Sequence, residues 1–268
     1  MRRSRSLKVA IIGAGGMARI LARIFKGRVS RVAIISRSLE KAKLFSRSLG
    51  IDYAPLDSVG EFDVIVLTPP PDVLPEVVRR ISPRLRAGSL VMDISSVKLG
   101  VIDEIASILP GEVEYLSIHP LFGSKARRLP GNVVVLIPVR GSSYLRVIRS
   151  VFESAGLRVV ESTPEEHDRI MAYVQVAHHL SYLSLALTLW NGLGSERARR
   201  FATRSLRRTF AMFELFHENL KVIREIATLN RYGAESVEYL KRTLDRLADG
   251  DPEAWAEVEK ALRELSRP

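Results

Sequence analysis

Short runs of β-branched and other apolar residues alternate with amphipathic segments over the first three-fifths of the chain. The runs are "LKVAIIG", "RVAIIS", "DVIVLT", "SLVMDIS", "EYLSI", "VVVLIP" and "LRVVES". Apolar runs of this length, separated by helical patterns, are typical of strands that are buried on both faces. The pattern predicts an α/β fold over residues 1–162, with a doubly wound parallel sheet and helices on both of its faces.

The pattern changes at "STPEEHD" to long amphipathic segments without a convincing strand. Thr163 can cap a helix there, and Glu166 completes its capping box. The pair Asp251 and Pro252 is a second helix start of the same kind. Further helices are expected over 196–216, 220–230, 234–248 and 252–265. Residues 163–268 should form an all-α C-terminal domain, and because this domain is small for a core of its own, we expect a homodimer built through it.

Composition narrows the classes of protein. The chain has no cysteine, which excludes disulfides, thiolate metal sites and a cysteine nucleophile and suggests a cytoplasmic protein; no metal site is expected. The apolar run near the N-terminus is too short for the core of a signal peptide. The longest later apolar run, 180–190, is about half of the roughly 20 residues that cross a bilayer, so no membrane span is expected.

The formal net charge is +11, from 41 basic and 30 acidic residues. The basic residues are spread along the chain rather than gathered with interleaved aromatics, so they favour an acidic small molecule over a nucleic acid as partner. Most of them are arginine, which suits bidentate binding of carboxylates and phosphates.

A glycine motif follows the first strand directly, in "VAIIGAGGMARIL". The spacing Gly13-x-Gly15-x-x-Ala18 places a tight turn, a close backbone approach for a pyrophosphate, and a small residue for strand–helix packing at the start of a helix. In this position the motif favours a Rossmann-type dinucleotide site over an ordinary glycine turn. The candidate cofactor-binding residues of the turn are Gly13, Gly15, Gly16, Met17 and Ala18.

The end of the second strand bears on the choice of dinucleotide. An NAD site usually has an acidic residue there for the ribose hydroxyls, whereas this chain has Ser36, Arg37 and Ser38, with Lys41 a turn later. Hydroxyl and basic side chains suit a 2′-phosphate, so we predict NADP rather than NAD. The alternative is that Arg37 is a solvated surface base and either cofactor is accepted.

Polar residues also follow three other expected elements. In "VIVLTPPPDV", Thr68 and Pro69 lie beyond a strand and should line the nicotinamide side. "MDISSVKLG" and "SIHPLFGS" each end a strand, and "EEHDRIMAYVQVAHHLSYL" opens the helical half. Taken with the glycine motif, in this order and at these spacings, the segments resemble the prephenate dehydrogenase family, which includes the arogenate and cyclohexadienyl dehydrogenases of tyrosine biosynthesis. The segment "GDPEAWAEVEKAL" resembles the last helix of that family, so the resemblance spans nearly the whole chain.

The resemblance implies an oxidative decarboxylation. Hydride leaves the ring carbon that bears the hydroxyl, the ring carboxylate departs as carbon dioxide, and the ring becomes aromatic. His119, in the H-P-x-F-G segment, matches the family residue that accepts the hydroxyl proton, a task suited to a pKa near neutrality. Ser96 matches the serine that hydrogen-bonds the substrate hydroxyl, and Ser95 is expected to be a turn residue. Without the resemblance, His119 would more often be a packing histidine at a strand end.

Other candidate substrate-binding residues are Lys98, Gln175, His179 and Arg207. Lys98 can offer its charge to a substrate carboxylate or the cofactor, or can be a helix-start lysine that points at water. Gln175 and His179 lie four residues apart and so share a helix face. The resemblance matches His179 to a substrate-region histidine, and the alternative is a hydrogen-bonded core histidine.

One family position departs from its pattern. The family has an arginine on a later helix that pairs with the ring carboxylate, and "MFELFHENLKVIREI" places Glu214 there. Arg207 lies seven residues earlier on the same helical face and can supply the missing guanidinium; Arg204 and Arg208 are lesser candidates. The alternatives are a shifted alignment and a changed substrate.

These observations favour an NADP-dependent prephenate dehydrogenase without a fused chorismate mutase. Arogenate is the alternative substrate, because its side chain carries an ammonium group that acidity in the site would favour. A second alternative is another two-domain NADP-dependent reductase with the same glycine motif. A non-enzymatic alternative is a cofactor-sensing protein that binds nucleic acid through its basic surface.

Overall fold

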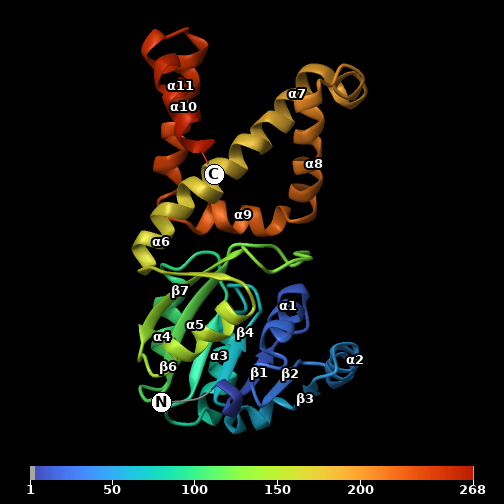
Figure 1. The fold of residues 1–268 in the computed structure, drawn as a ribbon, viewed down its shortest axis with the longest axis vertical. Helices are drawn as coiled ribbons and strands as arrows, with labels where there is room; N and C mark the ends of the chain where they lie inside the picture. The colour runs from blue at the N-terminus through green and yellow to red at the C-terminus, as the bar shows by residue number, and fades with distance from the viewer. Residues whose placement is uncertain (1–3, 268) are drawn as a thin grey trace. The chain divides into compact units, whose positions relative to one another are not determined.

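An eight-stranded sheet organises the first of the two units into which the chain divides, Met1–Glu165 and Glu166–Pro268. The computed structural model describes residues 4–267. The strands are β1 (Lys8–Ile12), β2 (Arg31–Ile35), β3 (Asp52–Tyr53), β4 (Val64–Leu67), β5 (Leu90–Asp93), β6 (Glu114–Pro120), β7 (Val133–Arg140) and β8 (Arg158–Glu161). Their order in the sheet is β3-β2-β1-β4-β5-β6-β7-β8 (Figure 1). The predicted doubly wound sheet is confirmed.

Two features of the sheet differ from the expectation. β7 pairs with β6 in antiparallel fashion, because the chain turns back between them through the loop 121–132, and β8 then pairs with β7 in parallel. β3 was not predicted, since it is two residues long, Asp52 and Tyr53, and both are exposed. Its two residues pair with Ala33 and Ile34 of β2 and extend the parallel edge.

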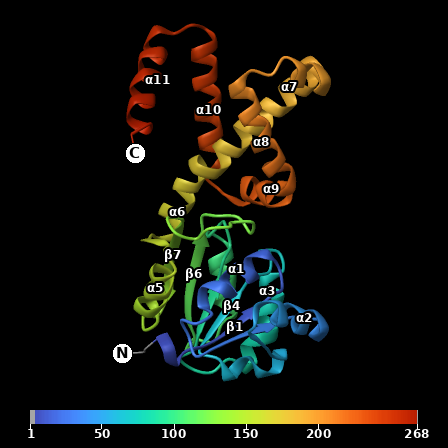
Figure 2. The same ribbon diagram turned by 45° about the vertical axis from the view of Figure 1, so that its right-hand side comes forward.

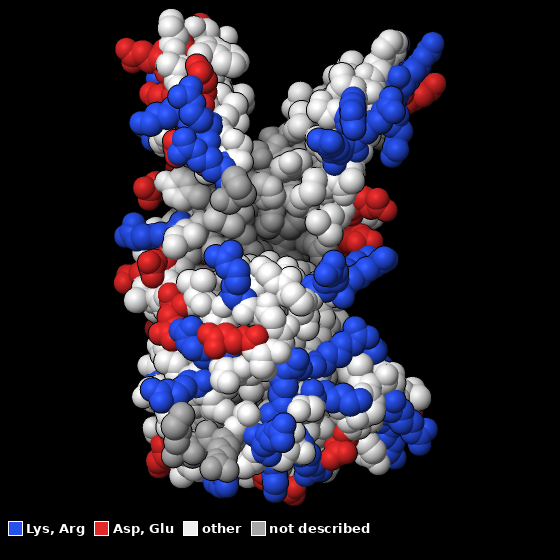
Figure 3. Space-filling model, in the orientation of Figure 1, with Lys and Arg blue, Asp and Glu red and all other residues white. Residues whose placement is uncertain are grey.

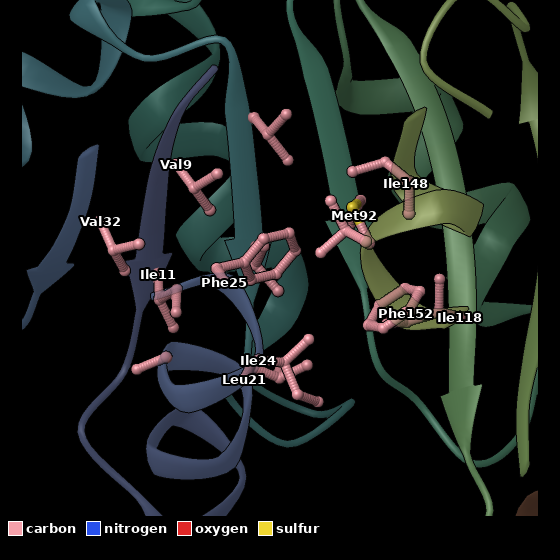
Figure 4. Close-up of a cluster of buried hydrophobic side chains, with 14 of the residues drawn as sticks. Val9, Ile11, Leu21, Ile24, Phe25, Val32, Met92, Ile118, Ile148 and Phe152 are labelled. Carbon is pink, nitrogen blue, oxygen red and sulfur yellow. The ribbon is translucent and has the colours of Figure 1, made fainter. Parts of the chain in front are cut away.

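Helices cover both faces of the sheet. They are α1 (Gly16–Phe25), α2 (Leu39–Leu49), α3 (Leu74–Ile81), α4 (Val101–Ile108) and α5 (Leu145–Ser154). Alternation along the strands divides the core: Val9 and Ile11 of β1 face the cluster that includes α1, α2 and α5, and Ala10 and Ile12 face the cluster that includes α3 and α4. In the first cluster the rings of Phe25 and Phe152 lie 6.0 Å apart (Figure 4). A core packed on both faces fixes the strand ends, where the site lies.

The second unit is helical, as predicted. Its elements are α6 (Pro164–Met171), a π-helical segment (Ala172–Ala177), α7 (His178–Arg200), α8 (Arg204–Glu218), α9 (Leu220–Leu229), α10 (Gly233–Ala248) and α11 (Pro252–Leu265). Asp251 caps α11 as expected, accepting from the backbone N–H groups of Glu253 at 2.9 Å and Ala254 at 3.3 Å. Figure 2 shows α10 and α11 side by side as an antiparallel pair.

The single helix expected over 196–216 was wrong. α7 ends at Arg200 and α8 begins at Arg204, because the Thr203 hydroxyl accepts from the Leu206 N–H at 3.2 Å and caps a new helix. Gly194 already interrupts α7, with φ 72° and ψ 164°, a conformation open to glycine. The break separates Arg197, Arg199 and Arg200 from Arg204, Arg207 and Arg208.

Basic and apolar side chains are both exposed on the second unit. The six arginines around the break are exposed, and Figure 3 shows basic side chains gathered over this end of α7. Large apolar residues of α7 are also exposed, among them Leu187 (62%) and Trp190 (64%). No helix in the described part of the chain is long and apolar enough to cross a bilayer.

Candidate active site

The glycine turn after β1 is shaped by its neighbours. Gly13 has φ 122°, and a Cβ at this position would lie 2.1 Å from Oγ1 of Thr68. The Thr68 hydroxyl donates to the carbonyl of Ile12 at 2.8 Å and so ties the end of β4 to the end of β1. Only glycine fits between these two strand ends.

Gly15 is surrounded by open space. A Cβ there would meet nothing within 4 Å, and the backbone angles, φ −96° and ψ −173°, are open to any residue. Gly15 precedes α1, whose first turn carries no acidic residue and whose N-cap makes no side-chain hydrogen bond. Free N–H groups and the positive end of the helix dipole suit a phosphate. The turn therefore fits the pyrophosphate of a dinucleotide.

Gly16 contacts a different segment. A Cβ at Gly16 would lie 2.5 Å from Cβ of Ser124, which belongs to the loop after His119. The loop that follows the candidate catalytic histidine thus touches the first residue of α1. Of the other turn residues, Ala18 is buried and Met17 packs partly buried against the core.

The residues predicted to select the cofactor lie after β2. Arg37 is exposed, whereas Ser36 and Ser38 are partly buried. The Ser38 hydroxyl oxygen caps α2 by accepting from the Lys41 N–H at 3.3 Å, which leaves its O–H free to donate. Hydroxyl and guanidinium donors are therefore present at the end of β2. Pro69 is partly buried beyond β4.

His119 lies near the end of β6 and is 3% exposed. It pairs with Val135 of β7, and side chains alternate along the strand, so Tyr115, Ser117 and His119 share one face of the sheet. Asp93, the last residue of β5, pairs with Ser117 and has no solvent exposure. A row of polar side chains thus runs along β6 into the site.

Lys98 is fully buried, which excludes the alternative of a lysine that points at water. Its Nζ donates to Oγ of Ser117 at 2.7 Å and to the carbonyl of Ile118 at 2.8 Å, and it lies 3.8 Å from Oδ1 of Asp93. Ile118 immediately precedes His119. The ammonium group therefore supports the backbone that presents the histidine.

The turn after β5 carries the two serines. The backbone N–H of Ser95 donates to Oδ1 of Asp93 at 2.8 Å, which agrees with the turn role expected of Ser95. Ser96 follows and is partly buried. β5 and β6 are neighbouring parallel strands, so Ser96, just after β5, and His119, near the end of β6, lie toward the same edge of the sheet.

Sequence reasoning missed Tyr115 and Asp93. The Tyr115 hydroxyl donates to Oδ2 of Asp93 at 2.8 Å, and burial together with the nearby carboxylate raises the pKa of Tyr115 above its usual value. Tyr115 therefore remains a donor. The alternation Tyr115-x-Ser117-x-His119 was the available signal, since residues two apart on a strand face the same way.

In the second unit, Gln175 and His179 carry buried polar atoms that lack partners. Oε1 of Gln175 and Nδ1 of His179 make no hydrogen bond within the described residues. Burial, followed by the charge of His178, lowers the pKa of His179 to about 4. The π-helical segment Ala172–Ala177 adds a residue to the turn at Gln175, a feature often found at functional sites.

His179 packs in an aromatic cluster on this unit. Its ring centroid is 5.0 Å from that of Phe216 and 5.5 Å from that of His178. The neutral ring therefore lies against apolar and aromatic groups, and its partnerless nitrogen distinguishes it from a hydrogen-bonded core histidine.

Arg207 and Glu214 are both exposed on α8. Nε of Arg207 donates weakly to the carbonyl of Ala202, at 3.4 Å. Within the described residues no hydrogen bond joins Arg207 to Gln175 or His179. The guanidinium of Arg207 is thus available for a ligand, and its role stays a prediction.

A buried pair opens the helical unit. Nδ1 of His167 lies 2.8 Å from Oδ1 of Asp168, and both side chains are almost fully buried. Asn230 donates to the backbone carbonyl of Asp168 at 2.8 Å, and its own Oδ1 accepts from the Tyr232 N–H. These contacts tie the start of α6 to the turn between α9 and α10.

Two family models match consecutive parts of the chain. The one described as "Prephenate dehydrogenase, nucleotide-binding domain" matches residues 21–161, and the one described as "Prephenate dehydrogenase, dimerization domain" matches 163–257. The first match begins after the glycine turn, so that turn is assigned from its geometry alone.

Curated relatives have related names. The chain is 27% identical over 208 residues to a probable arogenate/prephenate dehydrogenase of Methanocaldococcus jannaschii, which covers 75% of this chain and 47% of the relative. It is 25% identical over 184 residues to the T-protein of Haemophilus influenzae, covering 68% and 45%. The chain thus spans about half the length of the curated relatives it matches.

Solved structures share the fold. Prephenate dehydrogenase from Aquifex aeolicus, solved with hydroxyphenyl propionate and NAD+, has a TM-score of 0.80 at 22% identity over 97% of this chain and 96% of that one. Arogenate dehydrogenase from Synechocystis has a TM-score of 0.78 at 20% identity, over 96% and 97%. With both domains of the family matched in order along one sheet-and-helix chain, this protein belongs to the prephenate dehydrogenase family.

Proposed function

We propose that this chain is a prephenate dehydrogenase of tyrosine biosynthesis, which converts prephenate to 4-hydroxyphenylpyruvate with transfer of hydride to NADP+. The observation that carries the proposal is the position of His119. It lies near the end of β6, almost fully buried, and the loop that follows it contacts the first residue of the helix at the glycine turn. The proton acceptor and the turn that would bind the dinucleotide would then belong to one active site.

The cofactor would be held at Gly13, Gly15 and Gly16, with the open space at Gly15 taking the pyrophosphate. When bound, the nicotinamide supplies the hydride acceptor. Thr68 and Pro69, beyond the end of β4, would border the nicotinamide ring.

In the proposed reaction, His119 accepts the proton of the substrate hydroxyl as its oxygen becomes a carbonyl oxygen. Ser96, beyond the neighbouring strand end, would hydrogen-bond that oxygen and orient it toward the imidazole. The position of His119 in a buried strand limits its rotation, so the proton transfer begins from a fixed geometry. Lys98 would act through the backbone before His119, since its ammonium already contacts Ser117 and Ile118.

In the helical unit, the predicted substrate-binding residues are Gln175, His179 and Arg207. The side-chain NH2 of Gln175 can donate to a carboxylate, and Nδ1 of His179 has no hydrogen-bond partner within the described residues. Arg207 offers an exposed guanidinium on the same face of α8 as Glu214. We assign Arg207 to the ring carboxylate, because a carboxylate at Glu214 would repel it.

Arogenate is the second candidate substrate. Its side-chain ammonium would be attracted by Glu214, and relatives named for either substrate match this chain. NADP is favoured by Ser36, Arg37 and Ser38 at the end of β2, where hydroxyl and guanidinium donors are present. A yeast relative is named as an NADP(+) enzyme, whereas a structural neighbour was solved with NAD+.

The protein would act as a homodimer through its helical unit. Exposed large apolar residues on α7 support this, because apolar patches on a surface often mark interaction sites. The second family model is described as a dimerization domain.

The direct test measures turnover by purified protein with prephenate and with arogenate, each with NADP+ and NAD+. Reduced nicotinamide is followed by absorbance, and 4-hydroxyphenylpyruvate or tyrosine by chromatography. Turnover of prephenate with a higher kcat/KM for NADP+ is expected. Turnover of arogenate alone would move the assignment to the second candidate, and no turnover of either substrate would refute the function.

A further inference from the structure

The polar row on β6 continues away from His119 into the interior of the sheet. Tyr115 lies four residues before His119, about 13 Å along the strand, and is fully buried. Its side chain extends from there to Asp93, the last residue of β5. The Tyr115 hydroxyl donates to Oδ2 of Asp93 at 2.8 Å.

Asp93 connects two parts of the site. Its Oδ1 accepts a hydrogen bond from the backbone N–H of Ser95, which belongs to the turn that carries Ser96. The same oxygen lies 3.8 Å from Nζ of Lys98. Lys98 in turn donates to Ser117 and to the carbonyl before His119. The Asp93 carboxylate therefore holds the turn after β5 directly through Ser95. It also balances the charge of Lys98, whose hydrogen bonds hold the end of β6.

From these contacts we infer that Tyr115 and Asp93 are positioning residues for both Ser96 and His119. The inference rests on the proposed function. Asp93 is fully buried, so without the Tyr115 hydroxyl its Oδ2 loses a donor and the carboxylate is held through Oδ1 alone. Rotation of Asp93 would loosen the Ser95 turn and the hold of Lys98 on β6 together.

The test compares two buried tyrosines of the same unit. Tyr115→Phe removes the donor to Asp93, whereas Tyr144→Phe removes a hydrogen bond of similar length, 3.0 Å, to the carbonyl of Gly88, which lies before the opposite end of β5. Tyr144 is also fully buried. Both variants lose one buried hydroxyl, so a general loss of packing affects both alike.

Tyr115→Phe should lower kcat by about tenfold with little change in KM for the substrate, because misplacement of reacting groups slows the chemical step more than binding. Tyr144→Phe should keep kcat within about twofold of the wild type. Its melting temperature should fall by a similar amount to that of Tyr115→Phe. Equal kcat values for the two variants would overturn the inference.

A second readout does not depend on turnover. In protein with 13C-labelled histidine, the ring resonance of His119 is identified as the one that His119→Asn removes. It should shift or broaden in Tyr115→Phe and stay unchanged in Tyr144→Phe. An unchanged His119 resonance in Tyr115→Phe would refute the positioning role, whether or not the protein turns over substrate. Absence of turnover with both prephenate and arogenate would refute only the proposed function.

Discussion

Two glycines of one turn are glycine for different reasons. Gly13 is confined, with a positive φ and Thr68 within 2.1 Å of where a side chain would begin, whereas Gly15 has ordinary backbone angles and empty space around it. The first glycine is thus needed by the fold, and the second is predicted to be needed by a ligand. A substitution at Gly13 should therefore change stability, and a substitution at Gly15 should change ligand binding.

Gly15→Ala is therefore expected to leave the melting temperature unchanged and to weaken NADP+ binding by about tenfold, or ~1.4 kcal/mol. Gly13→Ala should lower the melting temperature, because the new methyl group strains the turn and displaces Thr68. Calorimetric melting and titration of the cofactor check both. Cofactor affinity in Gly15→Ala equal to that of the wild type would contradict the site.

The candidate residues could be predicted where their signal was local. The glycine turn and Ser96 follow a strand, His119 lies near the end of one, and all three match ordered motifs. The contact of Tyr115 with Asp93 could not be predicted in the same way, because it depends on the register between β5 and β6. The burial of Lys98 likewise depends on the strand that covers it and not on its neighbours in sequence.

At the scale of elements, the strands and most helices could be predicted because their boundaries carry local signals, such as the Asp251 cap of α11. The break between α7 and α8 has a local signal too, the cap at Thr203, which the helix expected over 196–216 ran across. The π-helical segment before α7 had no signal in the sequence, since an inserted residue depends on packing.

The packing of His179 of α7 against Phe216 of α8 predicts how the stability of the protein depends on pH. With a folded pKa of about 4 and an unfolded value of 6.5, His179 binds fewer protons in the folded state between these two pH values. Stability therefore falls as the pH drops from 6.5 to 4, and is unaffected by this group above 6.5.

His179→Leu should lose less stability than the wild type between pH 7 and pH 4.5, as measured by urea midpoints. The exposed His217 on α8 offers the control, His217→Leu, which should keep the slope of the wild type. A wild-type slope in His179→Leu would show that the histidine is not held neutral by its surroundings.

At the scale of the whole molecule, apolar residues that one chain leaves exposed point to a second copy. Leu187, Trp190 and Leu193 of α7 are 62%, 64% and 48% exposed. Such a helix cannot be explained by the core of its own unit. The amphipathic pattern predicted the helix but not that its outer face would also be apolar.

Light scattering should give about twice the mass of one 30.0 kDa chain. Trp190→Asp should shift the protein toward the monomer, because a charge would replace a large apolar contact. Leu44→Asp is the matched control, since Leu44 is 67% exposed on α2 in the other unit, and it should remain dimeric. A wild-type protein at the mass of one chain would contradict the dimer.

The proposed role of His119 as the proton acceptor of an oxidative decarboxylation can be tested by replacing its imidazole. His119→Asn keeps a polar side chain of similar size but cannot take the proton, so kcat for prephenate with NADP+ should fall by roughly 100-fold or more while cofactor binding persists. His217→Asn, on the exposed face of α8, should keep the wild-type rate. A kcat for His119→Asn within about twofold of the wild type would contradict the account.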